Sequence, residues 1–125
     1  MARILIAEDE ESLRKLVARA LTQDGHEVLA CADGGEALDT LTRKNGRFDL
    51  LLTDIRMPVM DGIALALAAS RDYPELTIVL MTGYADQRER AHGLEALIRD
   101  IVTKPFTLGE IRDVVKGALT ARVLS

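Results

Sequence analysis

Several features that would assign the chain to a common class are scarce or missing. Its 125 residues include one cysteine, Cys31, which excludes an internal disulfide and fits a reduced, cytoplasmic protein. No apolar run approaches the roughly 20 residues of a membrane-spanning helix. The N-terminus, MARILIAEDEE, becomes acidic too early for a secretion signal. We therefore expect a protein that is neither secreted nor embedded in a membrane.

An excess of basic residues is also missing. The 16 Lys and Arg against 20 Asp and Glu give a net charge of -4, so binding to nucleic acid through clustered positive charge is not expected. With 48% apolar and 29% charged residues, the composition is that of a globular protein. The length suits one domain, which we expect over residues 1–121, followed by a short tail at 122–125. We expect no effector domain, and a monomer or weak dimer.

Two hydrophobic periodicities alternate along the chain. Short apolar runs predict strands at residues 3–7, 27–32, 49–53, 76–82 and 100–103. Most of these runs are nearly continuous, which predicts strands that are buried on both faces. Helical spacing predicts helices at 34–44, at 63–71 and, with Gly93 inside it, at 85–96. Two more apolar stripes predict buried helix faces: Leu13, Leu16, Val17, Ala20 and Leu21, and Leu108, Ile111, Val115, Ala118 and Leu119.

This alternation predicts an α/β fold. Strands that are joined through helices make right-handed crossovers, which give a parallel sheet with helices on both faces. Ligands of such sheets bind beyond the carboxyl ends of the strands. The residues at these ends are therefore the first candidates for function.

Acidic, hydroxyl and cationic residues occupy the predicted strand ends. Glu8 and Asp9 follow the first strand, Asp54 follows the third, Thr82 ends the fourth, and Lys104 follows the fifth. Each alone has an ordinary explanation, such as a helix cap or a solvated lysine. Together they match phosphoryl transfer to a carboxylate with Mg²⁺, an ion that usually takes one or two protein carboxylates.

The hypothesis gives each residue a role. Asp54 is the nucleophile and becomes an acyl phosphate, while Asp9 and Asp54 hold Mg²⁺. Without the ion, repulsion within the cluster should raise the proton affinity of at least one acid. Lys104 neutralises one phosphoryl oxygen, and the Thr82 hydroxyl donates to another.

Four motifs together resemble the response-regulator receiver domain over essentially the whole chain: AEDEE, LLLTDIRMPVMDG, LMTGYAD and VTKPF. The resemblance implies a flavodoxin-like (βα)5 three-layer sandwich with strand order 2-1-3-4-5. It also implies that a histidine kinase or a histidine phosphotransfer protein phosphorylates Asp54. By the same resemblance, the main-chain carbonyl of Arg56 binds Mg²⁺, Glu8 assists through water, and the Lys104–Pro105 peptide is cis.

Two positions depart from the family's pattern. Ile101 stands where most members carry the Tyr or Phe whose rotation reports phosphorylation, and Leu97 stands where many carry Gly. We hypothesise that Tyr84, two residues after Thr82, takes over part of this gating.

Output is expected through protein contact. Arg88, Arg90 and Arg99, with Pro105 and an exposed Ile101, predict a mixed basic and apolar partner face near the fifth strand. In detail the chain is similar to the CpdR-type stand-alone receivers. This resemblance implies an adaptor that, when unphosphorylated, primes the ClpXP protease; the alternative is a phosphorelay intermediate that passes the phosphoryl group on.

Other classes fit the residues less well. A haloacid-dehalogenase-like phosphatase also uses an Asp nucleophile, but it needs an acid two residues later, where Arg56 stands. In a flavodoxin-like cofactor binder, the acids after the first strand would repel the phosphate. We therefore expect a phosphoacceptor signalling domain, not an enzyme, which assists its own Mg²⁺-dependent phosphorylation and dephosphorylation.

Overall fold

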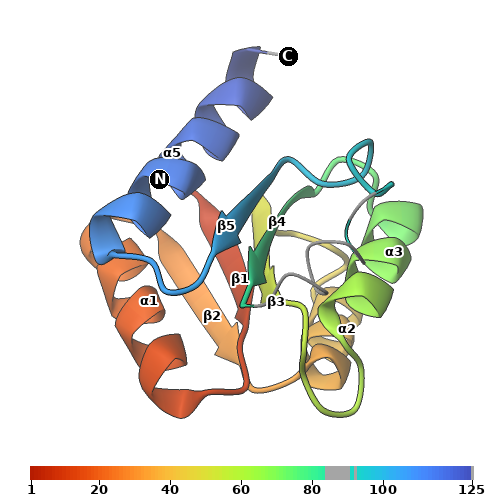
Figure 1. Cartoon of the computed structure of the whole chain (residues 1–125). Helices are drawn as coiled ribbons and strands as arrows, with labels where there is room; N and C mark the ends of the chain where they lie inside the picture. Colours follow the sequence, from red (N-terminus) through yellow and green to blue (C-terminus); the bar gives the residue numbers. More distant parts are fainter. Residues whose placement is uncertain (84–90, 92, 125) are drawn as a thin grey trace.

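The computed structural model describes residues 1–83, 91 and 93–124, which form one parallel sheet with helices on both sides (Figure 1). The strands are β1 (Arg3–Ala7), β2 (Glu27–Cys31), β3 (Leu50–Asp54), β4 (Thr77–Thr82) and β5 (Asp100–Thr103). The helices are α1 (Glu11–Gln23), α2 (Gly34–Arg43), α3 (Gly62–Asp72) and α5 (Leu108–Leu124). The strand order β2-β1-β3-β4-β5 confirms the predicted fold class.

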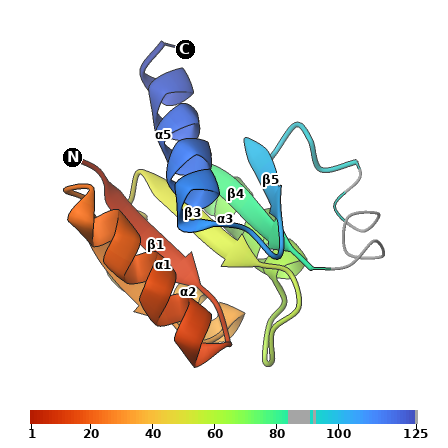
Figure 2. The same cartoon turned by 60° about the vertical axis from the view of Figure 1, so that its left-hand side comes forward.

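Two hydrophobic cores lie on opposite faces of the sheet, because successive strand residues point to opposite sides. Leu5 and Leu51 pack towards α2 and α3, whereas Ile4 and Leu50 pack towards α1 and α5. Figure 1 shows the sheet between these two pairs of helices, and Figure 2 shows α1 and α5 in front of it. The central strands β1, β3 and β4 are therefore covered on both faces, as predicted.

The two edge strands, β2 and β5, are less covered than the central ones. In β2, the side chains of Glu27, Leu29 and Ala30 are exposed, and β5 is covered only in part. An edge strand has a neighbour on one side only, so less of the fold covers it. Leu16, predicted on the buried face of α1, is 49% exposed. Because α1 packs mainly over the β2 edge, only the centre of its apolar stripe is covered.

The remaining helices follow the predicted pattern with small changes at their ends. Asp33 caps α2 by accepting a hydrogen bond from the Glu36 N–H, and Asp61 caps α3 by accepting one from the Ala64 N–H. Helix α5 runs through residues 122–124, which the sequence analysis assigns to a tail, and its last turns project beyond the sheet (Figure 1). The predicted helix at 85–96 falls mostly outside the described residues.

None of the helices in the described part of the chain combines the length and the apolar character that a bilayer span requires.

Candidate functional site

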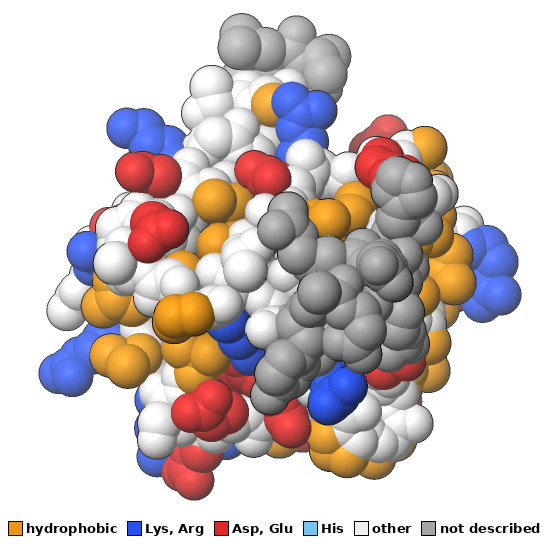
Figure 3. Space-filling view, in the orientation of Figure 1, with side chains coloured by type: hydrophobic (Ala, Val, Ile, Leu, Met, Phe, Trp, Pro, Cys, Tyr) orange, Lys and Arg blue, Asp and Glu red, His pale blue; other side chains and the backbone are white. Residues whose placement is uncertain are grey.

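The carboxyl edge of the sheet brings the predicted acids together. Glu8 and Asp9 follow β1, and Asp54 is the last residue of β3. One carboxylate oxygen of each lies within 4.8 Å of the others. Figure 3 shows acidic side chains gathered on the lower part of this face, below the strand ends. A cavity of about 560 Å³ is lined by this cluster together with Glu10, Leu13, Arg56, Gly83, Lys104, Pro105 and Phe106.

Lys104 lies between two of the carboxylates. Its ammonium group donates to Glu8 Oε1 at 2.6 Å and to Asp54 Oδ2 at 2.9 Å. Its main-chain N–H donates to the carbonyl oxygen of Thr82 at 2.6 Å, which holds the lysine against the end of β4. The peptide bond to Pro105 is cis, as predicted. The ammonium group therefore offsets part of the negative charge of the cluster.

Burial changes the proton affinity of this group of residues. Glu8 is 1% exposed, and its burial raises its pKa to about 7; the hydrogen bond from Lys104 opposes the rise, and the charge of Asp54 adds to it. Burial lowers the pKa of Lys104, but its hydrogen bonds to Glu8 and Asp54 and the negative charges of these two carboxylates together raise it more, so the net shift is upward. The pKa of Glu8 is thus raised, in the direction predicted for one acid, but burial rather than repulsion within the cluster is the largest cause.

The main chain around β3 orients the Asp54 carboxylate. The N–H of Ile55 donates to Asp54 Oδ1 at 2.9 Å, and Oδ2 faces Lys104. Helix α3 begins at Gly62, whose N–H donates to the Ile55 carbonyl at 2.7 Å. A Cβ atom at Gly62 would clash with the carbonyl oxygen of Asp54. A glycine is therefore required for this close approach of α3 to the end of β3.

Thr82 offers a hydrogen-bonding group that the described residues do not use. It is fully buried at the end of β4, and its Oγ1 has no hydrogen-bond partner within the described part of the chain. Such a group costs about 1–3 kcal/mol, which a ligand could recover. Carboxylate oxygens are the ligands that Mg²⁺ prefers. The acids and this hydroxyl therefore fit a site for Mg²⁺ and a phosphoryl group.

The other predicted residues do not all lie at the acidic site. Arg56 is exposed and lines the site cavity. Ile101, expected to be exposed, is half-buried and packs against the core on the α2 and α3 side. Arg99 is exposed. Three residues lie outside the described ranges: Tyr84, Arg88 and Arg90.

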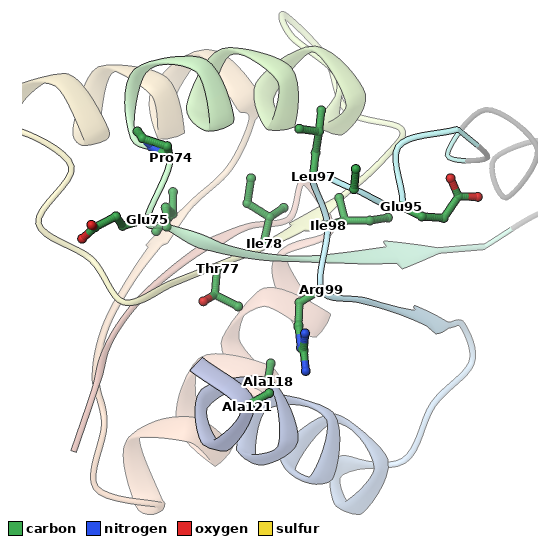
Figure 4. Close-up of a pocket in the computed structure, with 12 residues that line it drawn as sticks. Pro74, Glu75, Thr77, Ile78, Glu95, Leu97, Ile98, Arg99, Ala118 and Ala121 are labelled. Carbon is green, nitrogen blue, oxygen red and sulfur yellow. The ribbon is translucent and has the colours of Figure 1, made fainter. Parts of the chain in front are cut away.

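A second hollow, of about 750 Å³, lies at the opposite end of the sheet (Figure 4). Its walls come from the start of β4, from the segment before β5 and from α5. In Figure 4, Arg99 points from the start of β5 towards Ala118 and Ala121 on α5. Leu97, which departs from the family's pattern, also lines this hollow and is 39% exposed. Of the residues predicted for the partner face, Arg99 lines this hollow.

Sequence reasoning missed two contacts at the acidic site. One is the main-chain donor of Ile55, which any residue could supply. The other is Arg14, whose Nη1 donates to the carbonyl oxygen of Glu8 at 2.9 Å. A cation one turn into a helix that follows an acidic loop is a weak signal, because many helices carry one there.

The fold and the site together define a class of protein. The doubly wound parallel sheet makes this a flavodoxin-like α/β protein, and the acidic cluster and lysine at its carboxyl edge fit a cation and a phosphoryl group. The family model of the response regulator receiver domain matches residues 4–116. The chain belongs to this family, whose members are phosphoacceptor signalling domains of two-component systems.

Individual relatives agree with this assignment. The chain is 36% identical over 121 residues to the response regulator receiver protein CpdR of Brucella abortus, covering 97% of this chain and 99% of that protein. It is also 36% identical over 115 residues, 92% of this chain, to the DNA-binding transcriptional regulator NtrC of Klebsiella pneumoniae, but spans only 24% of that protein. The response regulator TrrA of Thermotoga maritima, solved with Mg²⁺ and BeF, is 30% identical with a TM-score of 0.82, covering 94% of this chain and 99% of TrrA.

Proposed function

We propose that the chain is a stand-alone response regulator that accepts a phosphoryl group on Asp54 from a histidine kinase or a histidine phosphotransfer protein in the cytoplasm. The observation that carries the proposal is the contact of Asp54 Oδ2 with Lys104 at 2.9 Å, beside two further carboxylates. A nucleophilic carboxylate, a fixed cation and a group of metal-ligand oxygens are what transfer to an aspartate needs.

The chain's own groups divide the chemistry among them. Oδ of Asp54 forms a bond to phosphorus while the bond to the donor's histidine nitrogen breaks, and that nitrogen keeps the electron pair. The Lys104 ammonium and the Thr82 hydroxyl are placed to stabilise charge on the phosphoryl oxygens. Asp9, Asp54, the Arg56 carbonyl and, through water, Glu8 would hold Mg²⁺. When bound, the ion offsets the charge that the acids and the phosphoryl group share.

Mass spectrometry after incubation with acetyl phosphate and Mg²⁺ tests the site. The wild type should gain one base-labile phosphoryl group, and Asp54→Asn should gain none. Asp39→Asn is a matched control, because Asp39 is an exposed acid on α2, away from the cavity, and it should be modified like the wild type. An adduct that persists in Asp54→Asn would move the acceptor to another residue.

We propose two possible outputs, a protease adaptor and a phosphorelay intermediate, and the similarity to CpdR favours the adaptor. Because CpdR and this chain align over nearly their full lengths, we propose an adaptor whose unphosphorylated form binds the ClpXP protease. The face that carries Arg99 and Leu97, beside the second hollow, is the proposed contact. The alternative is a relay that passes the phosphoryl group to a second histidine protein.

Purified ClpX separates the two outputs. An adaptor should be retained by immobilised ClpX as wild type and as Asp54→Ala, and phosphorylation of the wild type should release it. A relay should show no retention but should transfer labelled phosphate to a histidine phosphotransfer protein. Retention that phosphorylation leaves unchanged would contradict the switching role of Asp54.

A further inference from the structure

A side chain of α1 holds the loop that carries two of the three carboxylates. Glu8, Asp9 and Glu10 connect β1 to α1, and the carbonyl oxygen of Glu8 accepts a hydrogen bond from Arg14 Nη1 at 2.9 Å. The main-chain N–H of Arg14 donates to the carbonyl oxygen of Glu10, also at 2.9 Å. Arg14 therefore bonds to both ends of this three-residue loop.

The other hydrogen bonds of the loop's main chain are longer than those to Arg14. The Glu8 N–H donates to the Cys31 carbonyl at 3.1 Å, which attaches the start of the loop to β2. The Glu10 N–H reaches Glu8 Oε2 at 3.3 Å, and Glu10, the N-cap of α1, makes no capping bond with its side chain. Within the described part of the chain, Arg14 is the one side chain from outside the loop that hydrogen-bonds to the loop's main chain.

The carboxylate of Asp9 depends on this support. Asp9 is exposed and makes no hydrogen bond or ion pair with any described residue. Its position is therefore set by its own main chain. The Glu8 carbonyl belongs to the same planar peptide unit as the Asp9 nitrogen. The bond from Arg14 thus fixes the plane from which the Asp9 side chain departs.

We propose that Arg14 is a positioning residue for the cation site and that, by holding the Glu8 carbonyl, it keeps the Asp9 carboxylate within ligand distance of Asp54. The inference rests on the proposed function, because it concerns the cation bound by this cluster. Charge repulsion alone predicts the opposite change in affinity when Arg14 is removed, because a guanidinium group near a cation site weakens cation binding. The two effects can therefore be told apart by the direction of the change in affinity.

Titration of metal-free protein with Mg²⁺, followed by NMR, tests the proposal through binding, without phosphorylation. Arg14→Met keeps most of the apolar stem but removes the donor and the charge, and it should raise the dissociation constant about tenfold. Arg14→Lys, which retains a charged donor, should recover part of this loss. Arg19→Met removes the same charge from an exposed position on the same helix, and it should leave the affinity unchanged or slightly tighter.

Amide hydrogen exchange in EDTA gives a second readout. In Arg14→Met the amides of Asp9 and Glu10 should exchange faster, while those of β1 and β3 should keep their wild-type rates. Mg²⁺ affinity in Arg14→Met that equals or exceeds that of the wild type would overturn the inference. If this variant does not fold, Arg14→Gln, which also removes the charge and the guanidinium group, takes its place.

Failure of the proposed function gives a different result. If the wild type binds no Mg²⁺, the proposed cation site is wrong, and so is the positioning role of Arg14. If the wild type and Arg14→Met bind Mg²⁺ equally well, only the role of Arg14 is wrong.

Discussion

Without metal, the stability of a Glu8→Gln variant relative to the wild type should increase as the pH rises. Glu8 has a folded-state pKa of about 7, against an ordinary value of 4.5. The folded state therefore keeps a proton that the unfolded state has already lost, so stability is greatest below the unfolded pKa and falls as the pH rises through the folded pKa. A shift of this size corresponds to about 3 kcal/mol at most. Gln cannot ionise, so the variant should escape this loss.

Denaturant unfolding in EDTA between about pH 5 and pH 8 measures the effect. The free energy of unfolding of Glu8→Gln minus that of the wild type should increase by about 2 kcal/mol over this range, because groups common to both proteins cancel. Glu10→Gln, a change at an exposed neighbour, should give a nearly flat difference. If the curves of Glu8→Gln and the wild type stay parallel, Glu8 does not carry the raised pKa and the reasoning fails.

Further predictions concern the backbone and the thiol. Val59 is 86% exposed with a φ of 68°; Val59→Gly should raise the free energy of unfolding by about 1 kcal/mol, since relief of left-handed strain exceeds the entropy cost of glycine, and thermal unfolding checks this. Gly62→Ala should destabilise by about 2 kcal/mol or more through its clash with the Asp54 carbonyl, and it should slow phosphorylation by acetyl phosphate. Gly117→Ala, in a helix with no atom near its Cβ, should stabilise by about 0.5–1 kcal/mol; loss of stability there would contradict this account. Burial raises the pKa of the Cys31 thiol, so a thiol reagent should modify it on the order of 100-fold more slowly in the native protein than in denaturant.

The sheet could be predicted from the sequence because its central strands are buried on both faces. Leu50, Leu51 and Leu52 form a continuous apolar run, and such a run has few alternatives to a central parallel strand. The exposure of Leu16 and Leu29 could not be predicted in this way. Hydrophobicity shows what a residue can bury, but the position of its strand or helix in the sheet decides how many neighbours cover it.

The site could be predicted as a set of residues but not as a set of contacts. Glu8, Asp9, Asp54 and Lys104 all stand at ends of parallel strands, and topology brings such ends to one edge. The bonds from Lys104 to two acids depend on rotamers and on the path of the chain after β5, neither of which has a periodic signal. The link from Arg14 to the Glu8 carbonyl has no such signal either.

The position of the Lys104 ammonium has a consequence for how the acidic site responds to metal. Two carboxylates already share a positive charge that the chain itself supplies. A dissolved cation must compete with this tethered one, whose local concentration is fixed by the fold and does not change with dilution. Binding of Mg²⁺ therefore adds a divalent cation to carboxylates whose negative charge Lys104 already offsets in part. We expect the affinity for Mg²⁺ to be weaker than the same carboxylates would give without the lysine.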